Sequence, residues 1–534
     1  MKRFFAVMLL LLYIFAAVLP VMAQDTTEGS VSAETEAVPD EQMWICMVCG
    51  TRNTDESCGE CGHPHGSWLC PDCQTVNTGE ICSECGKAFA DLQLAELEDG
   101  IYFGEYPDGK RHGHGILFYY KDDEKNRLKY TGEWNEDQRS GQGTLVWTTG
   151  DTYEGEWAGN TINGQGTYTS DEFVYTGEWK DGSIDGTGKV TYSDGVIYEG
   201  EFKNGLRDGY GIYNNSSGFI VEGSWKDDAT DGFAKAVFPE GDIYEGEWKN
   251  NRMEGQGTLT SPDGVIYTGE WLQGQKHGMG TITSPEGDKY EGEWKNSSRD
   301  GQGKMTWSTG DFYEGSWVQG SRTGQGKYIW ADGAVYEGEW KDNMRHGYGT
   351  MTKPDGTVYE GQWENDLPNG QGKKTWPDGA VYEGQWKDDK GHGHGKMTYP
   401  DGFVYEGDWK NGRKEGKGIQ TADDGSSYDG DWVDDAREGN GKMTYTDSSV
   451  YVGQWEKNRR SGSGILISAD GSSYEGEWGN GVRNGQGKMT WPDGTVYEGE
   501  WENGVRSGQG KMTWPDGTFY EGEWEDDELI SILS

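Results

Sequence analysis

The residues of this sequence best suited to chemistry are eight cysteines, all of which fall between positions 46 and 85. They form four evenly spaced CxxC pairs: Cys46 and Cys49, Cys58 and Cys61, Cys70 and Cys73, and Cys82 and Cys85. A CxxC turn places two thiolates on one side of a tight loop, and two such turns facing each other supply four sulfur ligands in a tetrahedron. Zn²⁺ suits such a ligand set best, with iron as the alternative.

The cysteine region, residues 44–86, is a tandem duplication. The pattern W-x-C-x2-C-x3-N-x4-C-x2-C starts at Trp44 and again at Trp68. Each half therefore owns four sulfurs, and we expect two zinc sites with four cysteine ligands each, one formed by Cys46, Cys49, Cys58 and Cys61 and one by Cys70, Cys73, Cys82 and Cys85. Because so short a segment cannot bury a core, the metal would hold its fold.

The pattern resembles two zinc ribbon modules, and the placement of tryptophan and asparagine is similar to that of the Ran-binding-protein zinc-finger family. The loop after the asparagine is shorter here than in that family, and no ligand is carried over from it, because its Thr-Phe pair is replaced by Gly50-Thr51 and Gln74-Thr75. Two other interpretations of the cysteines stay open. Export would favour disulfides, and CxxC pairs also occur as redox motifs, usually at a helix start.

The first 23 residues have the organisation of a secretory signal peptide. A basic start (Lys2, Arg3) precedes an apolar run, and small residues lead up to Ala23. We expect cleavage after Ala23 and an exported protein, whereas an uncleaved segment would anchor the protein in a membrane. Residues 24–43 are rich in Thr, Ser and Glu, which predicts a flexible acidic linker.

Residues 87–100 are predicted to form a short helix that caps the segment following it. Four apolar residues are spaced roughly for one helical face: Phe89, Leu92, Leu94 and Leu97. Gly100 would end this helix.

A 23-residue pattern fills residues 101–534. Its tyrosine recurs on one grid from Tyr244 to Tyr520, and the spacing slips only further upstream. A fixed period of this length indicates a repeat array in which neighbouring copies bury a continuous core. Val221 stands at a grid point in place of tyrosine, and Ala234 replaces a glycine in the same copy, so we expect a local bend there.

The copy that starts at Tyr497 predicts a β-hairpin. Tyr497, Gly499 and Trp501 alternate with Glu498 and Glu500, which places aromatic and acidic side chains on opposite faces. Polar residues 502–507 predict a loop, alternation resumes over 508–514, and Trp-Pro-Asp-Gly predicts a type I turn closed by a left-handed glycine. The expected fold is therefore all-β, an elongated, twisted, single-layer antiparallel sheet.

The strand glycines have a predicted purpose in such a sheet. A glycine inside a strand is costly unless something must approach the backbone closely. Here the aromatic rings of the same face can lie over the bare backbone, so that one layer buries apolar area without a second. On the opposite face, Glu498 is expected to pair with Lys488 or Lys511.

The consensus Y-E-G-E-W-x-N-G-x-x-x-G-x-G-x-M-T-W-P-D-G resembles the membrane occupation and recognition nexus (MORN) repeat. The resemblance covers residues 102–524. It implies an elongated antiparallel sheet and a role in scaffolding, self-association or phospholipid binding.

The charge balance disfavours several classes of partner. With 93 Asp and Glu against 47 Lys and Arg, the net charge is -46, which argues against nucleic acid and anionic lipid. No P-loop, kinase motif or nucleophile arrangement is present in the sequence. We therefore expect an exported, non-catalytic scaffold that binds a protein partner or self-associates along the ribbon. Association with a membrane is the alternative.

Overall fold

The computed structural model of the chain describes residues 44–46, 52–53, 63–64, 67–71 and 75–533. The predicted signal peptide (1–23) and acidic linker (24–43) lie outside these residues, as do Cys49, Cys58, Cys61 and Cys73. In the part of the chain that the structure describes, no helix is long and apolar enough to cross a membrane.

The duplication of the cysteine region is visible in its strands. β1 (Trp44–Ile45) pairs antiparallel with β2 (Arg52–Asn53), and β3 (Trp68–Leu69) pairs in the same way with β4 (Val76–Asn77). Trp44 lies opposite Asn53, and Trp68 lies opposite Asn77. The tryptophan and asparagine of the repeated pattern therefore mark one hairpin in each half.

The prediction of a short helix over residues 87–100 is wrong. The segment forms a 3₁₀ turn, η1 (Phe89–Asp91), and then β5 (Gln93–Leu97), which pairs antiparallel with β6 (Gly100–Glu105). The leucines expected on one helical face are split, since Leu92 is buried and Leu94 is exposed. The free edge of β6 offers backbone partners, and pairing with it outweighs the weak helical preference of a short segment.

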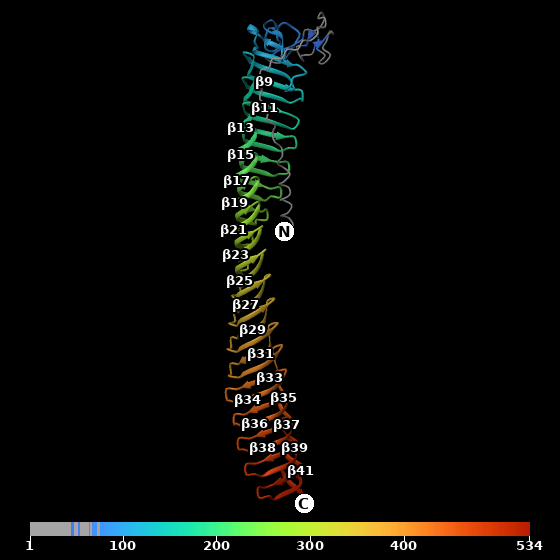
Figure 1. The fold of residues 1–534 in the computed structure, drawn as a ribbon, viewed down its shortest axis with the longest axis vertical. Helices are drawn as coiled ribbons and strands as arrows, with labels where there is room; N and C mark the ends of the chain where they lie inside the picture. Colours follow the sequence, from blue (N-terminus) through green and yellow to red (C-terminus); the bar gives the residue numbers. More distant parts are fainter. Residues whose placement is uncertain (1–43, 47–51, 54–62, 65–66, 72–74, 534) are drawn as a thin grey trace. The chain divides into compact units, whose positions relative to one another are not determined.

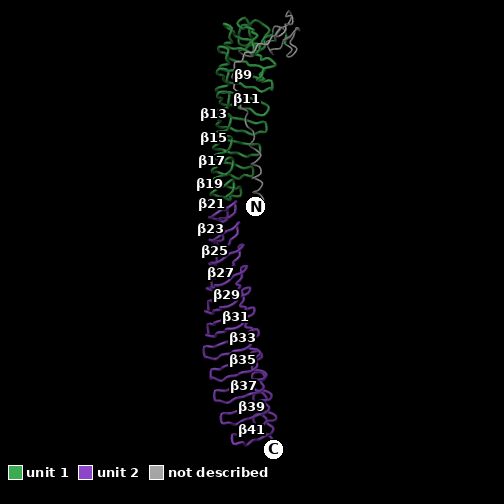
Figure 2. The backbone as a smooth tube through the Cα atoms, in the orientation of Figure 1, with its two compact units in different colours: residues 1–282 green, residues 283–534 purple. Residues whose placement is uncertain are grey.

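The repeat array is divided between two compact units, residues 1–282 and residues 283–534 (Figure 2). Within each unit the strands follow one another in chain order as a single antiparallel layer (Figure 1). The predicted all-β meander is thereby confirmed.

The remaining strands of the first unit, with the short turn η2 (Pro107–Gly109), are β7 (His112–Tyr119), β8 (Arg127–Asn135), β9 (Gln138–Trp147), β10 (Thr152–Ala158), β11 (Thr161–Thr169), β12 (Phe173–Lys180), β13 (Ser183–Tyr192), β14 (Ile197–Lys203), β15 (Leu206–Asn214), β16 (Ile220–Lys226), β17 (Ala229–Val237), β18 (Ile243–Lys249), β19 (Arg252–Thr260), β20 (Ile266–Leu272) and β21 (Gln275–Thr283).

The strands of the second unit are β22 (Lys289–Lys295), β23 (Ser298–Thr306), β24 (Phe312–Val318), β25 (Ser321–Ile329), β26 (Val335–Lys341), β27 (Met344–Thr352), β28 (Val358–Glu364), β29 (Leu367–Thr375), β30 (Val381–Lys387), β31 (Lys390–Thr398), β32 (Val404–Lys410), β33 (Arg413–Thr421), β34 (Ser427–Val433), β35 (Ala436–Thr444), β36 (Val450–Glu456), β37 (Arg459–Ile467), β38 (Ser473–Gly479), β39 (Val482–Thr490), β40 (Val496–Glu502), β41 (Val505–Thr513), β42 (Phe519–Glu525) and β43 (Glu528–Ile532).

The hairpin of β40 and β41 shows the register of a regular copy. Gly499 lies opposite Gly510, and the register then shifts at a bulge so that Trp501 faces Arg506. The loop predicted over residues 502–507 is too long, because only Asn503 and Gly504 form the turn. Both have positive φ values, 48° and 93°, as a two-residue hairpin turn that matches the strand twist requires.

Two departures from the regular copy behave differently. β16 and β17, which carry Val221 and Ala234, pair in the same register as regular hairpins, so their pairing shows no sign of the expected bend. The last copy, which starts at Tyr520, has a shortened second strand, because β43 pairs with β42.

The core of the array lies between neighbouring tyrosines and tryptophans on one face. The ring of Tyr497 meets Trp501 of its own strand at 5.3 Å and Trp524 of the next copy at 5.2 Å, both edge to face. Tyr497 is fully buried as a result. Edge-to-face pairs of this kind add to the stability gained from burial alone. The stack links this copy to the next one.

Backbone groups satisfy the polar ends of these rings. The hydroxyl of Tyr497 donates to the carbonyl of Glu500 at 3.1 Å, and the indole of Trp524 donates to the carbonyl of Gly510 at 3.1 Å. A β-carbon on Gly510 would lie 2.2 Å from the Tyr497 hydroxyl oxygen. The predicted purpose of the strand glycine, close approach of a ring, is therefore confirmed.

Candidate metal centre and interaction surfaces

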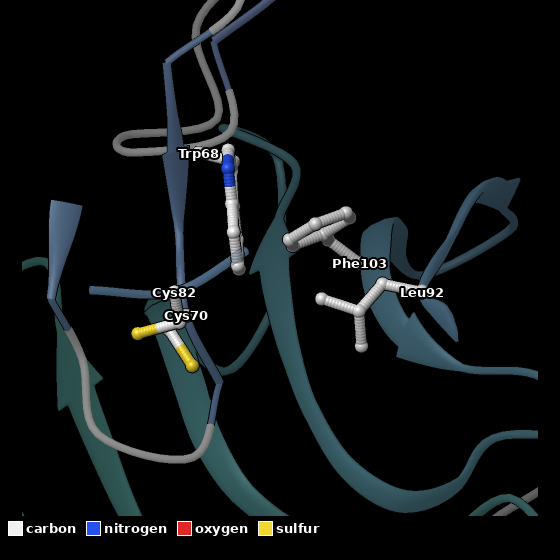
Figure 3. Close-up of a cluster of buried hydrophobic side chains, with 5 residues drawn as sticks. All are labelled: Trp68, Cys70, Cys82, Leu92 and Phe103. Carbon is white, nitrogen blue, oxygen red and sulfur yellow. The ribbon is translucent and has the colours of Figure 1, made fainter. Parts of the chain in front are cut away.

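Three cysteines come together where the sequence predicted the second metal site. The Sγ atoms of Cys70, Cys82 and Cys85 lie within 4.8 Å of one another, and those of Cys70 and Cys85 are 3.4 Å apart. Cys70 and Cys82 lie in a buried cluster (Figure 3), whereas Cys85 is exposed. The fourth predicted ligand, Cys73, lies outside the described residues. Of the other predicted site only Cys46 is described, and it is buried.

The asparagine of the repeated pattern orders the loop that carries this cluster. The side-chain amide of Asn77 donates to the Sγ of Cys82 at 3.5 Å and to the carbonyl of Thr75 at 2.7 Å. Its oxygen accepts from the backbone N–H of Ser83 at 3.0 Å. A hydrogen bond donated to sulfur favours the thiolate, which is the form that binds metal. Asn77 is thus a positioning residue for the cluster.

The cysteine module packs onto the first copy of the array. Trp68 meets Phe89 at 5.5 Å and Phe103 at 6.3 Å between ring centroids, in a buried cluster that includes Cys70 and Cys82 (Figure 3). Leu69 extends this contact to a second buried cluster with Ile116 and Phe118. At the margin, the Lys87 ammonium lies 2.6 Å from the Glu105 carboxylate. The module therefore covers one face of β6 and β7.

That covered face is the one opposite the tyrosines, and we call it the groove face. In a regular copy it carries Glu498, Glu500, Gln509 and Lys511, which line an open polar groove of about 410 Å³. The Lys488 ammonium of β39 lies 2.6 Å from the Glu498 carboxylate of the neighbouring β40, so the ion pair formed is the first of the two that the sequence left open. Exposed pairs of this kind contribute little stability. Their effect is to keep this face polar and solvated.

The sequence did not reveal the role of the arginine at the start of the second strand. The sequence predicted a loop at Arg506, but this residue lies in β41. Its guanidinium is 4.4 Å from the centre of the Trp524 ring and donates a hydrogen bond to the carbonyl of Asp527 at 2.7 Å. It closes the aromatic face against solvent. The sequence does contain a pattern that could have revealed this role, because an arginine recurs nine residues after the first tyrosine of many copies: Arg299, Arg322, Arg345, Arg437, Arg460, Arg483 and Arg506.

Burial of the aromatic face has an electrostatic consequence. It raises the pKa of Tyr451, Tyr474 and Tyr497 from 10.0 to about 12, mainly because the phenolate would be desolvated. These hydroxyls are therefore structural hydrogen-bond donors at neutral pH. Burial also lowers the pKa of Lys276, which replaces arginine above Tyr267, to about 8.

Fold and faces together define a tandem β-hairpin repeat protein with a small cysteine module on its first copy. The family profile of the MORN repeat matches eighteen successive segments between residues 102 and 519, from 102–124 to 497–519. The chain therefore belongs to the MORN repeat family.

Several solved structures show a weaker likeness. The SAS-4 TCP domain in complex with a proline-rich motif of Ana2, from Drosophila melanogaster, is 14% identical over 33% of this chain and 90% of its own, with a TM-score of 0.20. The TCP10 domain of Danio rerio CPAP in complex with a STIL peptide is 16% identical over 52% and 97%, with a TM-score of 0.14. A streptogramin B lyase is 14% identical over 50% of this chain and 81% of its own, with a TM-score of 0.11. Such low TM-scores say nothing about the partners of this chain.

Proposed function

We propose that this protein is an exported, non-catalytic scaffold whose repeat array binds protein and whose cysteine module is held together by zinc. The observation that carries the proposal is the contrast between the two faces of the array. The chain closes its own aromatic face with tyrosine, tryptophan and arginine. The opposite face carries polar side chains that recur with the repeat, as in the open groove lined by Glu498, Gln509 and Lys511. Regularly repeated surfaces of this kind are what repeat proteins use for binding.

The donor set supports zinc at Cys70, Cys73, Cys82 and Cys85. Bonds of about 2.3 Å to a tetrahedral Zn²⁺ separate two sulfurs by about 3.8 Å. The 3.4 Å between Cys70 and Cys85 is close to that value and longer than the ~2.05 Å of a disulfide bond. A bound zinc would supply a cross-link that the small module cannot replace with a core. The duplication extends the proposal to a second site at Cys46, Cys49, Cys58 and Cys61.

Elemental analysis of the purified full chain, combined with a thiol count, tests the metal. We expect two zinc ions per chain, with all eight thiols becoming reactive only after chelation. Cys85→Ser should remove one of the two ions, whereas the control Thr78→Ala, an exposed residue of the same module, should retain both. Absence of zinc together with absence of thiols would establish disulfides instead.

Export follows from residues 1–23 and is tested on the secreted protein itself. Mass spectrometry of protein recovered outside the cytoplasm should give a chain that starts at Gln24. A chain that retains residues 1–23 and sediments with membranes would show an uncleaved anchor. Recovery of the chain only from the cytoplasm would contradict export altogether.

Proximity labelling in the producing cell, with sedimentation velocity of the purified chain, tests the scaffold role. We expect a reproducible protein neighbour or a concentration-dependent oligomer. Flotation with vesicles containing anionic lipid, at low salt, is the parallel measurement. Because the chain carries a net charge of -46, we expect no flotation. Flotation without any protein partner would replace the scaffold with a phospholipid-binding protein.

A further inference from the structure

The groove face changes character on β15 and β17 in the first unit. Regular copies carry glutamine between the two glycines of the second strand, as at Gln256 and Gln509. Here the same position holds Tyr210 and Phe233, whose side chains are 54% and 64% exposed. Ile212, two residues beyond Tyr210 on the same face, is 42% exposed. Large apolar side chains gathered on an exposed surface mark an interaction site more often than a free one.

These side chains lie close enough to act together. Tyr210 faces Ser224 of β16, and Ile212 faces Glu222. β17 is the next strand, so the backbones that carry Tyr210 and Phe233 are about 10 Å apart, the width of two strand spacings. Ser224 stands between them where regular copies have a glutamate, as at Glu500. Serine is smaller than glutamate, so less side chain separates Tyr210 from Phe233. We call Tyr210, Ile212, Ser224 and Phe233 the aromatic patch.

The same chain shows how such a surface is covered. Ile116 occupies the repeat position of Ile212, on the groove face of the first copy, and it is fully buried because Leu69 packs against it. Trp68, the neighbour of Leu69, covers Phe103 on the adjacent strand. Two adjacent large apolar side chains of a short extended segment therefore supply much of the cover on this face, and Phe89 and Leu92 complete it over Phe103.

The charge around the patch restricts the flanks of its occupant. Glu201, Glu222 and Glu247 border it, and the Tyr210 hydroxyl donates to Glu222 at 2.7 Å. The Lys235 ammonium is held by Glu245 at 2.6 Å. The border is therefore negative, within a chain whose net charge is -46. Lysine or arginine beside the apolar anchor would complement it.

We propose that the aromatic patch binds an extended segment of a partner protein that carries two adjacent large apolar residues flanked by lysine or arginine. This inference deepens the proposed scaffold function and rests on it. The anchor pair would fill the space above Ser224 between the rings of Tyr210 and Phe233, and the basic flanks would lie along the glutamates. The remaining groove face is mostly polar, and its exposed apolar side chains (Met279, Ile419, Val452 and Ile465) include no second pair of aromatic rings, so it would contribute less to affinity.

A random 12-residue peptide library displayed on phage, selected on the full-length protein and depleted on the variant Tyr210→Gln/Phe233→Gln, tests the proposal. Glutamine is the residue of regular copies at this position, so the variant should keep the fold. We expect enriched peptides with an adjacent apolar pair and basic flanks. Their dissociation constants, measured by fluorescence anisotropy, should rise at least about tenfold in the double variant, which corresponds to about 1.4 kcal/mol.

Tyr348→Gln is the matched control. Tyr348 is an equally exposed tyrosine at the same repeat position, and its hydroxyl likewise donates to a glutamate, Glu360. It stands without apolar neighbours at the surrounding groove positions, which are Gln325, Thr350 and Gln371. We expect this variant to bind the selected peptides as the wild type does. Equal weakening by Tyr348→Gln would show that any exposed aromatic suffices and would overturn the proposal.

Other outcomes separate this inference from the scaffold role. The inference would be overturned by enriched peptides that are acidic, that lack the apolar pair, or that bind the double variant as tightly as the wild type. A partner protein labelled to the same extent by the wild type and by the double variant would leave the scaffold role intact. Loss of oligomers in the double variant, without peptide binding, would assign the patch to a second copy of this chain. Absence of peptides, partners and oligomers alike would end both proposals.

Discussion

At the scale of single residues, the array depends on a fit between a tyrosine ring and a glycine backbone. In regular copies a β-carbon on the second-strand glycine would collide with the tyrosine, as Gly510 would with Tyr497. The irregular copy breaks both sides of this fit at once. Val221 has no ring, and the methyl group of Ala234 is buried on the second strand. The two substitutions therefore form one compensated change.

A double-mutant cycle on this pair tests the fit. Val221→Tyr alone should destabilise the hairpin of β16 and β17 by about 1–3 kcal/mol, because its ring would meet the Ala234 methyl group. Val221→Tyr/Ala234→Gly should recover that loss, with a coupling energy of about 1–3 kcal/mol. Hydrogen exchange of the amides of β16 and β17 is the measurement, since long repeat arrays need not unfold in one step. Additive effects of the two substitutions would contradict the fit.

The arginine above each tryptophan gives a second prediction. Arg460 lies 4.1 Å from the Trp478 ring centre and donates to the carbonyl of Gly481 at 2.8 Å. Arg460→Ala should destabilise its hairpin by about 1–2 kcal/mol through loss of both contacts. Faster exchange of the Gly481 amide, which donates to the carbonyl of Arg460, would report it. The exposed neighbour provides the control, because Arg459→Ala should leave that exchange unchanged.

At the scale of elements, the cysteine module and the first hairpin form one packed structure. The groove face of β6 and β7 is apolar, unlike that of regular copies. It is buried by Trp68 and Leu69 of β3, together with Phe89 and Leu92. If zinc holds the module, then metal binding also decides whether Phe103 and Ile116 are covered. The state of four sulfurs would thus be coupled to the first strands of the array.

Removal of the metal should therefore expose an apolar face. We expect a chelator to increase the fluorescence of an added hydrophobic dye, while the near-UV circular dichroism of the array changes little. Phe103→Thr/Ile116→Thr is the control, since the next copy carries Thr131 and Thr144 at these positions. Its dye response to the chelator should be weak. A wild-type response that is absent, or equal to that of the control, would show that docking does not depend on metal.

At the scale of the whole molecule, stability is shared among many equivalent buried tyrosines. Their pKa is raised in the folded state. The folded chain therefore keeps phenol protons that the unfolded chain loses near pH 10. Below that pH both states keep the proton and stability is unaffected. Between about pH 10 and about pH 12 the unfolded state alone ionises, and the free energy of unfolding falls. Because the tyrosines act in parallel, the fall should be steep.

Urea denaturation at about pH 8, about pH 9 and about pH 11 measures this effect. We expect similar midpoints at the two lower values and a markedly lower midpoint at the highest. Phenolate absorbance of the folded protein should rise near pH 12 for the buried residues, whereas the urea-unfolded chain should ionise near pH 10. A midpoint that stays constant up to about pH 11 would mean that the tyrosines are far less desolvated than their burial indicates.

The sequence by itself determined the repeat, the alternation of faces, the purpose of the glycines and the pairing of Glu498 with a lysine of a neighbouring strand. All of these follow from short-range spacing, which repetition makes legible. Contacts distant in sequence decided the rest. The segment that contains Leu94 and Leu97 forms a strand because it pairs with the free edge of β6. Arg506 lies in a strand, and not in the predicted loop, where it packs on Trp524 of the next copy. The docking of Trp68 and Leu69 on Phe103 and Ile116 was likewise settled only in three dimensions, because the apolar area buried there belongs to two separate elements.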